Sequence, residues 1–430
     1  MIRRKGTSRT ANWRAVVLAA FILLVAAANN VDAHLGWPQA SSRTEREVAY
    51  TGVGGVKLAG TLVEPLLPAG QRVPGVVILP GGGPTDRNGN DNGSNSGPDL
   101  YKMMATALAD AGIASLRYDK RGVGGSDPTP GDIGPATDFA AWENYVGDAV
   151  ASLRYLQRQP EIDALHTALV GHSEGSILAE QTAIGGIGFT NPPVALVLVS
   201  GPGRPFDMVV RDQIAKTVNE QTALGTPQET AQLLLTTYDQ TVAGIKQNGQ
   251  IPAEPLEALQ NERTLSSRVK NQVLSLFDST RTKFWSGIVK ADPAKLAAQY
   301  RGPVLVIQGG KDTQVAPTED APALDAALKS RPNDNHELFV VPNASHWLKA
   351  VQDQTTESGT EGPIVPEAAS KLTSWLTGRL NANIASDASS AEQQSGAPMV
   401  ALVMGGVLIL VVGAIVVLLR KRPGSAAPSP

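Results

Sequence analysis

Short runs of apolar residues alternate along the middle of the chain with longer segments in which apolar residues recur every three or four positions. Apolar runs of this length are typical of buried β-strands, and the recurrence is typical of helices that bury one face. Strands are predicted at 46–52, 57–63, 75–80, 113–118, 166–171, 194–200, 303–308 and 337–342. Helices are predicted at 99–111, 138–158, 174–184, 318–329 and 366–380.

This alternation of strands and helices predicts an α/β fold with an eight-stranded, mostly parallel sheet. The right-handed crossovers between parallel strands place the connecting helices on both faces of the sheet. The first two strands are separated only by Gly52-Val53-Gly54-Gly55, which fits a hairpin turn.

The segment 207–300 interrupts the alternation, because it is rich in Gln, Ala, Leu, Lys and Glu and contains no strand pattern. Val269, Val273 and Leu276 are spaced as on one helix face. Since the segment lies between two predicted strands, we interpret it as a helical cap over the carboxyl edge of the sheet. The predicted division is therefore a core in two parts, 44–206 and 301–380, with the cap between them.

Both ends of the chain carry apolar stretches. Basic residues precede the run Val16–Ala28, which predicts a signal peptide over 1–33; an uncleaved anchor is the competing interpretation. The stretch 398–419 has no charge and is followed by Arg420-Lys421-Arg422. Its 22 residues would span about 33 Å as a helix, enough for a bilayer core of about 30 Å.

These ends predict a single-pass protein of the cell membrane. The basic cluster acts as a stop-transfer signal, so the tail 420–430 is expected in the cytoplasm. The segment 381–397 is rich in Ala, Ser and Gln and predicts a flexible linker. The folded domain is therefore expected on the extracytoplasmic side, with the membrane as its partner through the C-terminal helix.

Composition excludes several classes of protein. None of the 430 residues is cysteine, so the sequence cannot form disulfides or thiolate metal sites. The net charge of −3 gives no footprint for nucleic acid. The glycine-rich segment Gly122-Val123-Gly124-Gly125 lacks the lysine of a phosphate-binding loop. No metal cluster stands out in the sequence, and the chemistry predicted below needs no cofactor.

The pentapeptide Gly171-His172-Ser173-Glu174-Gly175 lies between a predicted strand and a predicted helix. Gly-x-Ser-x-Gly in this context is typical of a nucleophile elbow, in which the serine occupies a strained turn above the sheet edge. A serine needs a base to take its proton. Of the five histidines, only His346 follows a predicted strand at its carboxyl end. Open α/β sheets bind ligands at that edge.

Asp312 likewise follows a predicted strand, 303–308, and would orient the imidazole of His346. An oxyanion hole is predicted from the backbone N–H groups of Gly82 and Glu174, with Gly81 and Gly83 as alternatives for the first donor. The catalytic residues are therefore predicted to be Ser173, Asp312 and His346, in that chain order.

Three motifs together resemble bacterial carboxylesterases of the α/β-hydrolase superfamily. They are Gly83-Pro84-Thr85-Asp86-Arg87, Tyr118-Asp119-Lys120-Arg121-Gly122 and the elbow pentapeptide, and the resemblance covers roughly 45–380. It implies an α/β-hydrolase fold and a serine hydrolase that cleaves short acyl esters of small molecules. Asp86 and Arg87 either form an ion pair that fixes their loop or are two solvated charges.

Two other functions remain open at this stage. One is a peptidase or aminopeptidase-like hydrolase of the same fold, and the other is a non-catalytic, membrane-tethered binding protein. The aromatic residues Phe277, Phe284 and Trp285 line an acyl pocket or form the core of the cap, and the cap core is the favoured interpretation.

Overall fold

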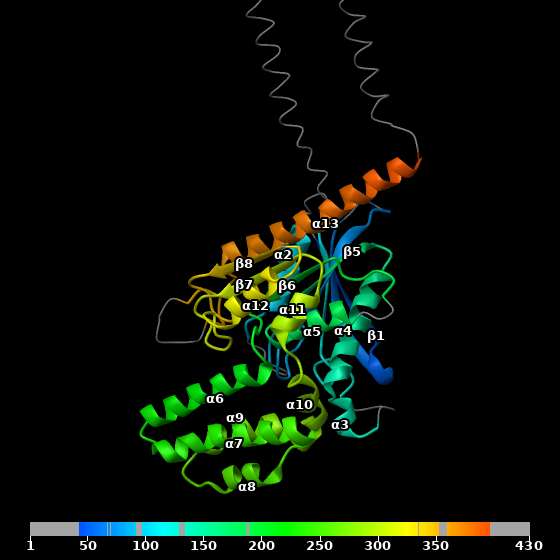
Figure 1. Ribbon diagram of the computed structural model, residues 1–430. Coiled ribbons are helices and arrows are strands. Elements are labelled where there is room, and N and C mark those ends of the chain that lie inside the picture. Colours follow the sequence, from blue (N-terminus) through cyan, green and yellow to red (C-terminus); the bar gives the residue numbers. More distant parts are fainter. Residues whose placement is uncertain are drawn as a thin grey trace, which may run out of the picture. The chain divides into compact units, whose positions relative to one another are not determined.

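Eight strands form one sheet in the order β1-β2-β4-β3-β5-β6-β7-β8 in the computed structural model (Figure 1). β1 pairs with β2, and β2 with β4, in antiparallel fashion, and the remaining neighbours are parallel. The predicted mostly parallel sheet and the first hairpin are confirmed. The strands are β1 (Arg43–Thr51), β2 (Lys57–Pro65), β3 (Val73–Leu79), β4 (Ala114–Tyr118), β5 (Ile162–His172), β6 (Ala195–Val199), β7 (Val304–Gly309) and β8 (His336–Val341).

The structure describes residues 43–395 except 67, 69, 92–96, 129–133, 186–188, 334 and 352–358. The chain divides after Asn381 into a first compact unit, which holds the sheet, and a second that begins at Ala382. The predicted signal peptide, the stretch 398–419 and the tail 420–430 lie outside the described residues. None of the described helices combines the length and the hydropathy that crossing a bilayer requires.

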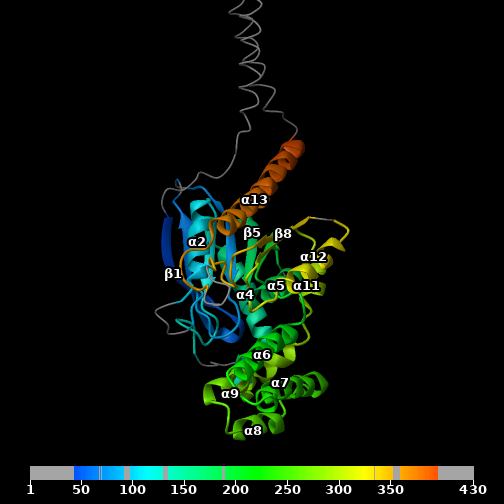
Figure 2. The ribbon, with the colours of Figure 1, turned by 90° about the vertical axis from the view of Figure 1, so that its left-hand side faces the viewer.

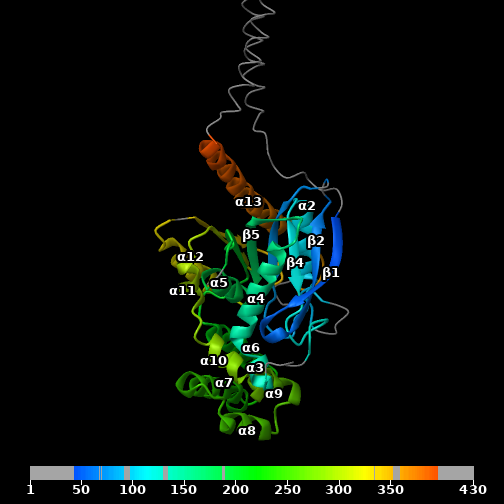
Figure 3. The same cartoon turned by 90° about the vertical axis from the view of Figure 1, so that its right-hand side faces the viewer.

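Two layers of helices cover the sheet, one on each face. α2 (Leu100–Asp110) and the first part of α13 (Pro366–Ser395) share one hydrophobic core with the sheet (Figure 2). α4 (Trp142–Gln157), α5 (Glu174–Ile184) and α12 (Asp320–Lys329) pack on the opposite face (Figure 3). The central strands β3, β4, β6 and β7 are therefore buried on both faces of the sheet, as their apolar sequences require.

Two predicted helices differ in extent from the structure. The predicted helix 138–158 is two elements, α3 (Ala136–Phe139) and α4, because Ala141 has extended backbone angles. α13 runs on to Ser395, well past the predicted end at 380 and into the segment predicted as a flexible linker. That segment contains helix-forming Ala, Glu and Gln, its first glycine is Gly396, and no proline occurs before Pro398.

Helices α6 to α10, which we call the cap, gather beyond one end of the sheet in Figure 1. Their shared core contains Tyr238, Phe277, Phe284 and Trp285. α11 (Pro293–Gln299), which we predicted as part of the cap segment, packs instead against α5 and α12 beside the sheet. The cap helices are α6 (Phe206–Ala223), α7 (Gln228–Asn248), α8 (Ala253–Asn261), α9 (Ser267–Leu274) and α10 (Thr282–Ile288), with short turns at Ser275–Phe277 and Ser279–Arg281.

The core beneath α5 contains a carboxyl group without a hydrogen-bond partner. Glu180 is fully buried, and among the described residues neither of its carboxyl oxygens has a partner. Burial, reinforced by the negative charge of Asp292, raises the pKa of Glu180 well above its ordinary value. Because the pKa is higher in the folded than in the unfolded chain, folding loses stability as the pH rises from the unfolded to the folded value.

Glu180→Gln is therefore expected to unfold at higher urea concentration than the wild-type chain at pH 8. The difference in free energy of unfolding between the variant and the wild-type chain should grow by up to about 1.4 kcal/mol per pH unit above pH ~4.3. Urea unfolding of the full chain at several pH values measures it. Glu257→Gln, at an exposed position, serves as the control and should show no such slope. A pH-independent difference for Glu180→Gln would contradict the prediction.

Candidate active site

Ser173 follows β5 directly and has backbone angles that a serine rarely adopts, φ 54° and ψ −126°. This strained turn reverses the chain from β5 into α5, which begins at Glu174. Two glycines make it possible, because a Cβ at Gly171 would lie 2.2 Å from the Gly175 carbonyl oxygen. A Cβ at Gly175 would lie 2.3 Å from the carbonyl oxygen of Leu79. The local geometry is that of the predicted elbow.

Asp312 and His346 lie at the same sheet edge, beyond β7 and β8, and are hydrogen-bonded. His346 Nδ1 donates to Asp312 Oδ2 at 2.8 Å, and both side chains are buried. The other carboxylate oxygen, Oδ1, accepts the backbone N–H groups of Gln314 (2.8 Å) and Val315 (2.9 Å). Burial alone would raise the pKa of Asp312, but His346 and these N–H groups lower it overall. Asp312 is therefore an ionised, fixed acceptor.

The loops that carry these two residues also touch through their backbones. A Cβ at Gly309 would lie 2.2 Å from the Ser345 carbonyl oxygen, so only glycine fits at the end of β7. The Lys311 N–H donates to the carbonyl of Ala344 at 2.9 Å. This close approach sets the separation of Asp312 and His346.

The glycine loop after β3 lies against the elbow. A Cβ at Gly81 would lie 3.3 Å from the Ser173 Cβ. The Gly81 N–H is already used, because it donates to the Tyr101 hydroxyl at 2.8 Å. Among the described residues, the structure records no hydrogen-bond partner for the N–H groups of Gly82 or Glu174. Gly81 therefore cannot serve as the alternative donor. The Glu174 N–H lies at the N-terminus of α5, where the positive end of the helix dipole also favours a negative charge.

His172 joins the glycine loop to the loop of His346. Its Nε2 lies 3.0 Å from the His346 carbonyl oxygen, which can only accept, so Nε2 carries the proton. Burial, and then the charge of His346, lower the pKa of His172 to about 3, so the ring is neutral. Its Nδ1 therefore accepts from the Tyr101 hydroxyl at 3.0 Å.

The other described histidines bond to carboxylates outside the site: His166 contacts Asp163 at 2.7 Å, and His336 contacts Asp325 at 3.0 Å. Of the four histidines that the structure describes, His346 alone carries the hydrogen bond to Asp312. The fifth, at position 34, lies outside the described residues.

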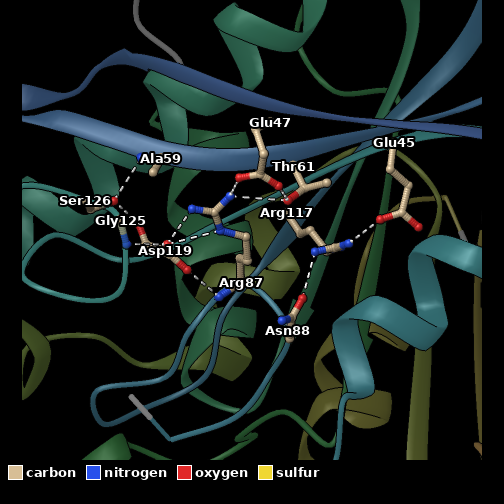
Figure 4. A network of polar contacts seen from close by, with 10 residues as sticks. All are labelled: Glu45, Glu47, Ala59, Thr61, Arg87, Asn88, Arg117, Asp119, Gly125 and Ser126. Atoms are coloured by element: carbon tan, nitrogen blue, oxygen red, sulfur yellow. Dashed lines mark hydrogen bonds and ion pairs between the residues drawn. The ribbon is translucent and has the colours of Figure 1, made fainter. Parts of the chain in front are cut away.

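Arg87 does not pair with Asp86, contrary to one of our interpretations. Its guanidinium binds Asp119, with Nη2 to Oδ2 at 2.7 Å, and also contacts Glu47 (Figure 4). The Arg87 N–H donates to Asp119 Oδ1 at 2.7 Å. Asp86 instead accepts the N–H groups of Asn88 and Asn90. The first two sequence motifs thus bind each other and fix the glycine loop.

One cavity of about 720 Å³ brings four of the five predicted site residues together. Ser173, His346, Gly82 and Glu174 line it, and Asp312 lies behind His346. Phe284 and Trp285 of the cap also line it, whereas Phe277 belongs to the cap core. Within the described part of the chain, no group of acidic residues and histidines is arranged to hold a metal ion.

Comparison with known proteins gives one family. Residues 92–350 match the family model described as serine aminopeptidase, S33. Esterase EstD of Thermotoga maritima is 24% identical over 307 residues, which cover 70% of this chain and 62% of EstD. An uncharacterised protein of Mycobacterium tuberculosis is 31% identical over 109 residues, 25% of this chain and 34% of that protein. The chain thus spans less than two thirds of these relatives.

Solved structures with a similar chain path include an esterase of Pyrococcus furiosus, with a TM-score of 0.44 and 17% identity over 80% of this chain and 97% of that chain. Carboxyl esterase 2 of the fungus Tuber melanosporum has a TM-score of 0.45 and 13% identity over 83% of this chain and 97% of its own.

Proposed function

The chain belongs to the serine aminopeptidase (S33) family of α/β-hydrolases, and from this premise we propose that it hydrolyses carboxylic esters through Ser173, His346 and Asp312. The observation that carries the proposal is the buried Asp312–His346 hydrogen bond, at 2.8 Å, beside a cavity that also contains the strained Ser173. Ester chemistry is further supported by the likeness to esterase EstD.

In the proposed reaction, Ser173 Oγ bonds to the ester carbonyl carbon while His346 Nε2 takes its proton. Nε2 is the only ring nitrogen available, because Nδ1 is bonded to Asp312. The carbonyl oxygen becomes an oxyanion and is received by the N–H groups of Gly82 and Glu174. The bond to the alcohol then breaks, and His346 returns the proton to the leaving oxygen. Water, deprotonated by His346, then attacks the acyl carbon, its bond to Ser173 Oγ breaks, and His346 returns the proton to Oγ as the carboxylic acid leaves.

The residues that line the cavity support an ester with a short acyl group as the substrate. Apolar side chains of the cap line the same cavity as the glycine loop, and the volume of about 720 Å³ is within the range of small-molecule sites. The apolar cap residues in the wall are Phe206, Val210, Ile214, Leu276, Phe284 and Trp285.

Aminopeptidase activity is the second candidate, and the description of the family favours it. An aminopeptidase needs a carboxylate for the substrate's free amine. Two carboxylates, Asp91 and Glu174, line the cavity. Glu174 is buried and faces Lys120 at 3.5 Å, which leaves Asp91 at the surface as the candidate group. Because one of the two carboxylates is already paired and the other lies at the surface, the cavity lining favours esters over peptides.

A fluorophosphonate probe is expected to label the full chain at Ser173, because the probe phosphonylates only an activated serine. Mass spectrometry of the labelled peptide identifies the residue. Parallel assays on p-nitrophenyl esters of increasing acyl length and on aminoacyl amides decide between the two activities. Faster turnover of the amides would replace the esterase proposal by the peptidase. Absence of labelling would favour a non-catalytic binding protein.

We also propose that the enzyme is tethered outside the cytoplasmic membrane by the stretch 398–419, after removal of the signal peptide 1–33. The support is the sequence alone: an uncharged run of bilayer length before Arg420-Lys421-Arg422. Protease added to intact cells is expected to degrade the catalytic domain. Protection of that domain until the cells are lysed would contradict this topology.

A further inference from the structure

Lys120 is a buried cation at the base of the glycine loop. It follows β4 by two residues, and its side chain is 5% exposed. Its Nζ donates to the Gly81 carbonyl oxygen at 2.6 Å and lies 3.5 Å from Glu174 Oε1. Burial lowers the pKa of Lys120, and the charge of Glu174 opposes that effect. Burying a lysine side chain lowers the stability of the fold unless its contacts compensate for the lost hydration. We therefore ask what each of these two contacts does.

The first contact orients a peptide group. No peptide bond in the described chain is cis, so the Gly81–Gly82 peptide has its C=O and N–H on opposite sides. Since Lys120 holds the Gly81 carbonyl, the Gly82 N–H must point the opposite way, away from the lysine. Gly82 lines the cavity, and the structure records no partner for its N–H among the described residues.

The second contact reaches the other predicted donor. Glu174 supplies a backbone N–H at the start of α5, and its carboxylate faces Lys120. The same carboxylate packs on the glycine loop, because a Cβ at Gly82 would lie 3.1 Å from Glu174 Oε2. Lys120 therefore contacts Glu174 itself and the carbonyl end of the peptide group that carries the Gly82 N–H.

The backbone beneath Lys120 is itself fixed. The preceding residue, Asp119, accepts three hydrogen bonds from Arg87 and one from the Gly125 N–H (Figure 4). Because Arg87 belongs to the same loop as Gly81 and Gly82, this cluster ties the loop to the lysine at a second point. Both ends of the Lys120–Gly81 contact are thus held in place before substrate binds.

We propose that Lys120 is the positioning residue of the oxyanion hole: by holding the Gly81 carbonyl and the Glu174 carboxylate, it aims the Gly82 and Glu174 N–H groups at the developing charge. The inference rests on the proposed ester hydrolysis. Donors placed in advance of the reaction contribute more to catalysis than donors that must reorient, and loss of one costs about 10²–10³ in kcat. A lysine that merely fills the core would have no such effect on the transition state.

Lys120→Met tests this role, because methionine keeps an unbranched side chain but cannot donate. The readout is the ratio of kcat/KM for a p-nitrophenyl ester to that for the matching thionoester, whose C=S sulfur is a weak acceptor. The ester rate is expected to fall by about 10²–10³, chiefly in kcat. The thionoester rate should fall far less, so the ratio collapses. This ratio does not depend on the fraction of enzyme that is folded.

Lys349→Met is the matched control. Lys349 is also fully buried and donates to a backbone carbonyl, that of Gly362, away from the glycine loop. Any loss there should reduce both substrates equally and leave the ratio unchanged. If Lys120→Met yields no folded protein, Lys120→Gln, which keeps a shorter N–H donor, should lower the ratio in part.

An unchanged ratio in the folded Lys120 variant would overturn the inference. Failure of the proposed function looks different: the wild-type enzyme would then hydrolyse neither the ester nor the thionoester, and no ratio would exist to compare.

Discussion

Ser173→Ala is expected to lower kcat for ester hydrolysis by about 10⁶-fold, the loss measured when the nucleophile of a triad hydrolase is removed. The alanine variant cannot form the acyl-enzyme. The residual rate would come from the oxyanion donors and substrate binding alone. KM should change little, because the hydroxyl contributes little to binding the ground state. Single-turnover and steady-state assays with one p-nitrophenyl ester measure both constants.

Ser200→Ala is a fitting control for this change. Ser200 likewise follows a strand of the same sheet and has a positive φ of 46°, but it is buried and does not line the cavity. Its replacement should leave kcat within a few-fold of the wild-type value. A Ser173→Ala enzyme with the wild-type rate would remove this serine from the reaction.

Asp312→Asn is expected to lower kcat by about 10⁴-fold, the effect of the same change in another triad. The structure gives the physical reason. Because the N–H groups of Gln314 and Val315 donate to Oδ1, the amide oxygen of an asparagine would occupy that position. Its NH₂ group would then face His346 Nδ1. The imidazole would have to accept there, which moves its proton to Nε2 and leaves no base for the serine.

The pH profile and a second pair of residues check this explanation. Asp325→Asn, which alters the His336–Asp325 pair outside the cavity, should not change kcat. In the Asp312 variant, activity should increase with pH into the alkaline range, where hydroxide substitutes for the lost base. An Asp312→Asn enzyme with the wild-type rate would show that the buried pair is structural.

The sequence predicted the elements of this site better than their contacts. Most strands contain a short apolar run, and the parallel strands of the sheet bring their carboxyl ends to one edge. The positions of Ser173, Asp312 and His346 at that edge were therefore predictable, since each follows a strand. The three charges Asp119-Lys120-Arg121 directly after β4 were a signal too, but local pattern does not say which distant carbonyl or carboxylate they meet.

Contacts that depend on tertiary packing were missed for the same reason. Arg87 follows Asp86 in the chain, yet its partner Asp119 is 32 positions away, because β3 and β4 are parallel neighbours and their following loops leave the sheet at the same edge. The hydrogen bonds of Tyr101 and His172 likewise join segments 71 and 174 positions apart. The extent of α13 was missed because a polar, alanine-rich segment has no apolar periodicity to mark it as a helix.

The cap leaves the sheet after β6 and the chain returns to it at β7, and these two strands are neighbours and parallel. Evolution could therefore exchange the whole cap for another sequence without shifting the register of the strands that carry the serine, the acid or the base. In such a graft, the chemistry would be inherited from one ancestor and the choice of substrate from another.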